Sequence, residues 1–141
     1  MNLTVLKDKL LKVGEKVGLQ VEEETATSLT LHTQITAKDY FSNSVYFRVV
    51  VFASGTLHVF FTFDEIERTY DNLYLINALN SENPWFRAYI ANINEKDYLE
   101  LHYASLGLES ENTAIDTVGY LLNELLSDNV IKYLKPILDK E

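Results

Sequence analysis

Three histidines are the residues of this 141-residue chain whose spacing first suggests chemistry. His32, His58 and His102 each follow a leucine, and each lies in a segment where apolar and polar residues alternate as in a β-strand. If those strands are neighbours, the imidazoles converge with Glu100 into a zinc or iron site, because both metals accept such ligands. The alternative is three ordinary strand histidines. No two of them lie close in sequence, so we predict no metal site and no cofactor.

Other catalytic patterns are missing from the sequence. Ser54-Gly55 has no G-x-S-x-G context, and there is no Gly-rich phosphate-binding motif of either common type. Acidic residues are plentiful, but no two of them stand out as an acid and base pair. We therefore predict that the protein is not an enzyme. A small-ligand or metal-binding protein or enzyme with a pocket near His32, His58 and His102 stays open as the alternative.

The clearest structural signal is a hairpin between Val45 and Phe63. Period-two alternation there predicts two strands, joined by a turn at Ala53–Thr56 in which Gly55 takes a positive φ. One face of this hairpin is apolar throughout and predicts a core. The other face also carries apolar residues, namely Tyr46, Val50, Phe52 and Phe60. Either the chain's own helices cover them, or they form a contact surface for a second subunit or a client peptide.

The rest of the chain predicts a single α+β domain spanning residues 1–141, with an antiparallel sheet of about five to six strands flanked by N- and C-terminal helices. The expected order is a helix, four strands, a helix, two strands and then one or two helices. Its segments are a helix at 2–17 that Gly18 ends, strands at 19–24 and 29–35, the hairpin, a helix from Asp71 that Pro84 ends, a hairpin at 85–93 and 98–104, and C-terminal helices that start at Ser110 or Thr113, with an interruption at 127–129.

Composition narrows the classes of partner. The formal net charge of −9 argues against nucleic-acid binding, which requires clustered Lys and Arg. Residues 1–17 carry a local charge of +2, so an N-terminal helix can dock on an acidic body or meet a partner. The chain has no cysteine, no signal-peptide pattern and no apolar run that would span a membrane. We therefore expect a cytoplasmic protein.

The second half of the chain carries a recognisable series of segments. They are Leu75-Ile76-Asn77-Ala78-Leu79-Asn80, Trp85-Phe86-Arg87-Ala88-Tyr89-Ile90, Tyr98-Leu99-Glu100-Leu101 and an amphipathic C-terminal helix pair. In this order they resemble the YbjN family of bacterial proteins, over about residues 73–134. The resemblance implies a fold similar to that of type III secretion chaperones, often dimeric, which bind other proteins and have no catalytic residues. Two departures are a single glycine, Gly107, before the last helices and a longer hairpin region in the first half. Asn77 and Asn80 are expected to satisfy main-chain groups after their helix, with Asn80 as a left-handed cap.

The sequence thus predicts a non-enzymatic protein-binding module that acts as a chaperone, adaptor or regulator in a bacterium. Its partner is another protein or a second copy in a homodimer, and its contact residues are Tyr46, Val50, Phe52 and Phe60. Another alternative is a phage-encoded or toxin-neutralising protein, since small acidic domains can mask basic partners.

Overall fold

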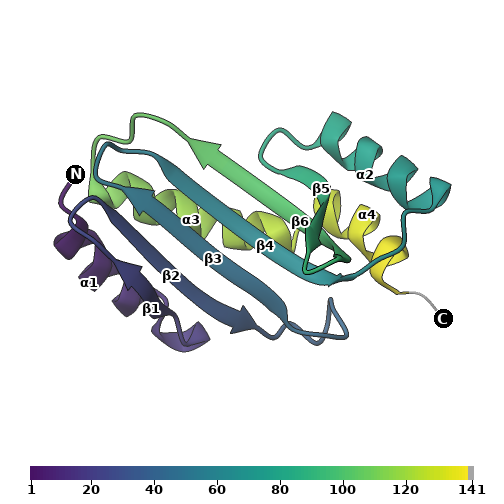
Figure 1. Cartoon of the computed structure of the whole chain (residues 1–141), viewed down its shortest axis with the longest axis horizontal. Coiled ribbons are helices and arrows are strands. Elements are labelled where there is room, and N and C mark those ends of the chain that lie inside the picture. Colours follow the sequence, from purple (N-terminus) through teal and green to yellow (C-terminus); the bar gives the residue numbers. More distant parts are fainter. Residues whose placement is uncertain (140–141) are drawn as a thin grey trace.

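A computed structural model describes residues 1–139 of the chain, and it confirms the predicted α+β fold. Figure 1 shows one antiparallel sheet with helices behind it. In chain order the elements are α1 (Leu3–Val13), a short 3-10 helix (Glu15–Val17), β1 (Gln20–Glu24), β2 (Ser28–Ile35), β3 (Val45–Phe52), β4 (Leu57–Glu65), α2 (Tyr70–Glu82), β5 (Arg87–Ile93), β6 (Lys96–Ser105), α3 (Glu111–Leu125) and α4 (Asp128–Leu138).

The sheet follows from four antiparallel connections between consecutive strands and one helical connection. Its strand order is β1-β2-β3-β4-β6-β5, and every neighbouring pair is antiparallel. Gly55 adopts a φ of 101° in the β3–β4 turn, as predicted. The β5–β6 turn places Asn94 and Glu95 at φ values of 53° and 68°, which two-residue hairpins require. Helix α2 carries the chain from β4 to β5, and β6 then returns between them.

The core lies between the sheet and the helices behind it. Each strand of the central hairpin buries its odd-numbered residues, and the rings of Phe47 and Phe61 stack there with centroids 5.1 Å apart. Helices α1, α3 and α4 bury one apolar stripe each, while α2 packs against α4 and β5. Apolar burial of this kind is the main contribution to folding stability. In the described part of the chain no helix is both long and apolar enough to cross a membrane.

Several predicted helix ends differ from the structure. The α-helical part of the predicted 2–17 helix ends at Val13, and the chain packs closely at Gly14, where a Cβ would lie 2.6 Å from the Leu19 Cβ. A short 3-10 helix follows, and Gly18 ends it in the left-handed conformation with a φ of 74°. Val13 is 59% exposed. The cap of α2 is Thr69, whose hydroxyl accepts from the Asn72 N–H, and not Asp71. Ser110, one of the two predicted caps, begins α3.

The asparagines of the YbjN-like segment act differently from the expected cap. Asn80 lies inside α2, where its side-chain amide donates to the Ala88 carbonyl at 2.8 Å and accepts from the Ala88 N–H at 2.6 Å. The expected left-handed cap at Asn80 is therefore wrong, because the helix continues to Glu82. Asn77 is exposed. Asn83, which ends the helix, accepts from the N–H groups of Trp85 and Phe86.

Among residues 1–139, no helix lies over the second face of the sheet. In Figure 1 this open face points toward the viewer, with β2, β3, β4 and β6 in front and α3 behind them. Of the two alternatives for the apolar residues on this face, coverage by the chain's own helices is therefore wrong for residues 1–139. The open face consequently becomes the place to look for a functional site.

Candidate functional site

Strand register arranges the side chains of the open face in rows. One row reads His32, Arg48, Phe60, His102 and Arg87 across β2, β3, β4, β6 and β5. The row on one side of it carries Gln34, Tyr46, Thr62, Glu100 and Tyr89, and the row on the other side carries Thr30, Val50, His58 and Ala104. Most of these side chains are half-buried, although no helix of residues 1–139 lies over them.

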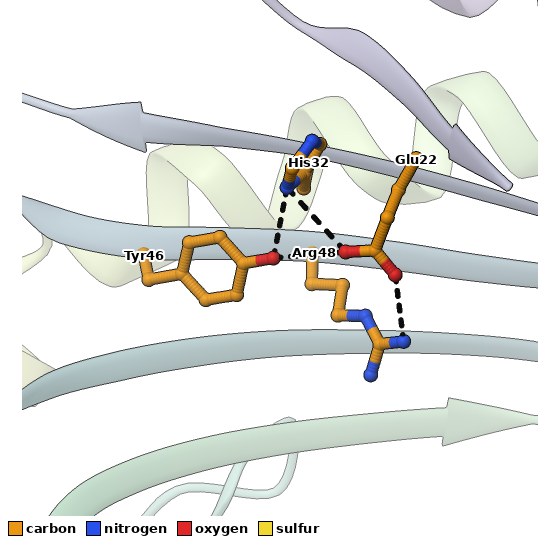
Figure 2. Close-up of polar contacts among 4 residues, drawn as sticks. All are labelled: Glu22, His32, Tyr46 and Arg48. Carbon is orange, nitrogen blue, oxygen red and sulfur yellow. Dashed lines mark hydrogen bonds and ion pairs between the residues drawn. The ribbon is translucent and has the colours of Figure 1, made fainter.

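A polar network occupies the β1 side of this face. Figure 2 shows the Glu22 carboxylate between three partners: it accepts from the Tyr46 hydroxyl and from Nη2 of Arg48, each at 3.0 Å, and lies 3.4 Å from Nδ1 of His32. The Tyr46 hydroxyl also lies 2.9 Å from that Nδ1. Each member therefore restricts the rotation of the others.

The electrostatics of the network follow from these contacts. Partial burial acts to raise the pKa of Glu22, but the hydrogen bonds from Tyr46 and Arg48 outweigh it, so the pKa lies below its ordinary value. Burial and the hydrogen bond to Glu22 raise the pKa of Tyr46. Nε of Arg48 is buried with no hydrogen-bond partner among the described residues. The network thus holds a carboxylate and a guanidinium charged and fixed, an arrangement that fits recognition better than proton transfer.

A second polar cluster lies on the β6 side. Nδ1 of His58 and Nε2 of His102 are 3.0 Å apart, and Phe60 stacks on His102 with ring centroids 4.5 Å apart. In the next row, Glu100 accepts from Thr62 at 2.8 Å and also from the Tyr89 hydroxyl. Burial, followed by that bond to Glu100, raises the pKa of Tyr89. The carboxylate of Glu100 is therefore held by Thr62 and Tyr89 and forms no hydrogen bond with either imidazole among the described residues.

The three predicted histidines do not meet in one site. His58 and His102 pair, whereas His32 faces Glu22 and Tyr46 at the other side of the sheet. Arg48 and Phe60 stand between His32 and His102 in the same row, which places them about 14 Å apart at ordinary strand spacing. Residues 1–139 contain no group of three or more His, Cys, Asp or Glu side chains arranged to hold a metal ion. The alternative, in which the three imidazoles converge with Glu100 into one metal site, is therefore wrong.

The predicted contact residues all lie on the open face, but they differ in character. Val50 and Phe60 are half-buried, and Phe52 is 39% exposed at the end of β3 beside the ring of His58. These three form the apolar end of the face. Tyr46 belongs to the polar network instead, because Glu22 and His32 engage its hydroxyl.

Sequence reasoning missed Glu22, the centre of the network. Strand β1 is an exposed edge strand, and its register with β2 shifts between Val21 and Glu23. This bulge interrupts the alternation of side chains at Glu22, so periodicity alone does not show which way Glu22 points. The only available signal was the presence of Arg48 and His32 on the polar faces of nearby strands.

The chain was also compared with known proteins. No protein-family model, no curated protein and no solved structure matches it. The resemblance to the YbjN family stays a prediction, and the site must be interpreted from its own geometry.

Proposed function

We propose that this protein is a non-enzymatic binding module that holds another polypeptide against the open face of its sheet, as a chaperone, adaptor or regulator. The resemblance to the YbjN family supports this role, a bacterial origin and the possibility of a homodimer. The absence of cysteine from the sequence fits the reducing cytoplasm.

One observation carries the proposal. No helix of residues 1–139 covers this face of the sheet, and its apolar end exposes Phe52 beside half-buried Val50 and Phe60. Antiparallel sheets often leave one face in water, but such faces are usually polar. An exposed aromatic with fixed polar groups beside it is typical of protein contact surfaces, where aromatic and Arg side chains supply most of the binding energy. Arg48 and Glu22 then act as fixed polar contacts next to the apolar end.

The test compares what the protein captures from cells with and without this surface. Phe52→Ser removes the exposed ring from the end of a strand without touching the core. We expect wild type to retain a defined protein that Phe52→Ser loses. The matched control is Val13→Ser on α1, which removes an exposed apolar side chain from another element.

Oligomeric state resolves the identity of the partner. If light scattering gives a dimer for wild type and a monomer for Phe52→Ser, the bound polypeptide is a second copy. The proposal fails if Phe52→Ser and Val13→Ser both behave as wild type in capture and in light scattering.

A further inference from the structure

Strand β6 extends beyond its neighbour at one edge of the sheet. Strand β5 begins at Arg87, opposite His102, whereas β6 continues to Ser105. Figure 1 shows this end of β6 with no strand on its outer side. The sheet therefore has a free edge of three residues, Tyr103–Ser105, which we call the β6 edge.

Hydrogen-bond alternation shows which main-chain groups face outward at the β6 edge. The two-residue turn makes Ile93 and Lys96 a hydrogen-bonded pair, so even-numbered residues of β6 direct their N–H and C=O groups toward β5. The bond from the Phe52 N–H to the Thr56 carbonyl leads to the same result when the alternation is followed through β3 and β4 to β6: the odd-numbered residues of β6 bond to β4, and the even-numbered residues face the other side. Ala104 is the next even residue after His102, and it is exposed. Its N–H and C=O therefore point to the side where β5 has ended.

The other edges of the sheet are protected in part. On β5, the Asn80 amide occupies both outward groups of Ala88 as a neighbouring strand would. On β1, three consecutive glutamates charge the edge, a common device against strand pairing. The β6 edge has no comparable cover among residues 1–139.

Hollows flank the β6 edge on both sides. A groove of about 330 Å³ lies between β6 and α3, and a wider one of about 610 Å³ lies on the open-face side, next to Arg87, His102 and Ala104. Trp85 lines both grooves. An extended segment added to β6 would direct alternate side chains into one groove and then the other.

Three aromatic rings line the smaller groove, which we call the aromatic groove. The Trp85 ring centroid is 4.8 Å from that of Tyr120 and 6.5 Å from that of Tyr103. Trp85 and Tyr120 are 40% and 46% exposed, so their rings remain accessible. The remaining lining residues come from one face of α3: Thr113, Asp116, Thr117 and Leu121.

The aromatic groove is held in place from behind. Buried Asn83 accepts from the N–H of Trp85 at 2.8 Å, and its Nδ2 donates to Glu124 of α3 at 3.2 Å. This bridge fixes the loop that carries Trp85 to the helix that carries Tyr120. The rings are therefore pre-organised, which lowers the entropic cost of binding.

The negative charge around the aromatic groove indicates which kind of side chain it binds. Residues 97–131 contain seven acidic residues and neither Lys nor Arg. Asp116 lines the aromatic groove and forms no ion pair with the described residues. Aromatic faces beside a carboxylate attract guanidinium and ammonium groups, with Trp as the strongest of the aromatic partners.

We propose that the β6 edge and the aromatic groove together bind an extended segment of a partner protein that carries an arginine or lysine. The segment pairs with Ala104 through its main chain. Its basic side chain, on the residue opposite Tyr103, enters the groove between Trp85, Tyr120 and Asp116. This site is separate from the Phe52 surface, and each can fail without the other.

Trp85 provides a direct probe, since it is the one tryptophan in the chain. The test titrates the protein with the peptide acetyl-Thr-Val-Thr-Arg-Thr-Val-Thr-amide and follows tryptophan emission. We expect a saturable change. Peptides with Leu or Glu in place of the arginine should bind about threefold to fivefold more weakly or not at all.

Matched variants distinguish binding in the aromatic groove from attraction to the negative charge of the whole protein. Asp116→Asn and Tyr120→Leu should each weaken binding of the arginine peptide by about threefold or more. Asp8→Asn makes the same change of charge on an exposed position of α1 and should leave binding unchanged. Thermal unfolding of each variant confirms that it is folded.

The peptide backbone tests strand addition without altering the protein. N-methylation of the two threonines that flank the arginine should abolish binding, because one of them pairs with Ala104, while N-methylation of the arginine should not. Equal binding of the arginine, leucine and glutamate peptides would overturn the proposal. Equal effects of the two N-methylation patterns would also overturn it, as would a dimer of the free protein that buries Trp85.

Discussion

The hydrogen bond between His58 and His102 links the open face to pH. One imidazole must donate and the other must accept, so the bond cannot survive when both rings are protonated. Burial and then the charge of His58 lower the pKa of His102; Arg87 adds to this and Glu100 opposes it. The folded protein therefore keeps His102 neutral at pH values where the unfolded chain protonates it. Because the unfolded state then binds more protons, stability falls as pH drops below about 6.5.

Replacing His102 with Gln should make this decline shallower. Glutamine keeps a polar group near His58 but does not titrate, so the free energy of unfolding should change less between pH 7 and pH 5.5 than in wild type. Urea unfolding at several pH values measures this change in the free energy of unfolding. His32→Gln is the comparison, because His32 lies outside the His58–His102 pair. An equally steep decline in His102→Gln would show that the pair is not its source.

Glu22 is the residue on which the polar network depends. Glu22→Gln removes the charge that Arg48 and Tyr46 contact, and we expect a loss of about 1 kcal/mol, modest because these side chains are partly exposed. The neighbouring Glu23→Gln should change stability by less than about 0.5 kcal/mol. The urea midpoint at unchanged m-value measures both. Since the pKa of Glu22 is lowered, its contribution is complete above about pH 4.5 and is lost as pH falls through the folded pKa.

At the scale of elements, Asn80 joins α2 to the edge of β5. Asn80→Ala removes two hydrogen bonds from Ala88 and leaves its main-chain groups partly buried, so we expect a loss of about 1–2 kcal/mol. Asn77→Ala, on the same helix but without the two hydrogen bonds that Asn80 forms, should be neutral or slightly stabilising, because alanine favours the helix more. Chemical denaturation of the two variants provides the comparison. Equal losses in both would contradict the edge-capping role of Asn80.

The elements themselves were predictable because side-chain periodicity reports burial directly. The faces of β3 and β4 followed from alternation, and Gly55 located their turn. The polar contacts that build the sites were not predictable, because they depend on register and on single side chains. Glu22 reaches Arg48 only through a bulge, and Asn83 reaches Glu124 across 41 residues of sequence. The β6 edge exists because β6 extends further than β5, and no local sequence pattern predicts this difference in length.

Considered as a whole, the molecule presents two surfaces of opposite physical character. The apolar end of the open face, around Phe52, binds a partner by burying apolar surface, and salt does not screen this interaction. The aromatic groove contains Asp116, and all of its lining residues except Trp85 come from residues 97–131, which contain no Lys or Arg, so binding there relies on charge. At 1 M salt the Debye length is about 3 Å, so exposed charges attract one another far less. The two surfaces should therefore respond differently to ionic strength.

Raising the salt concentration from about 0.05 M to about 1 M should weaken the binding of the arginine peptide severalfold. Screening removes most of the attraction between the peptide and Asp116 with its surrounding acidic residues. A polypeptide held by Phe52 should remain bound under the same conditions, since its apolar contacts persist. Tryptophan emission measures the first, and capture at both salt concentrations measures the second. If the Phe52-dependent partner is released at high salt, its contact is electrostatic, and Arg48 and Glu22 rather than the apolar end hold it. If the affinity for the arginine peptide does not change with salt concentration, the groove binds the peptide through ring stacking alone, and Asp116 has no part in selecting it.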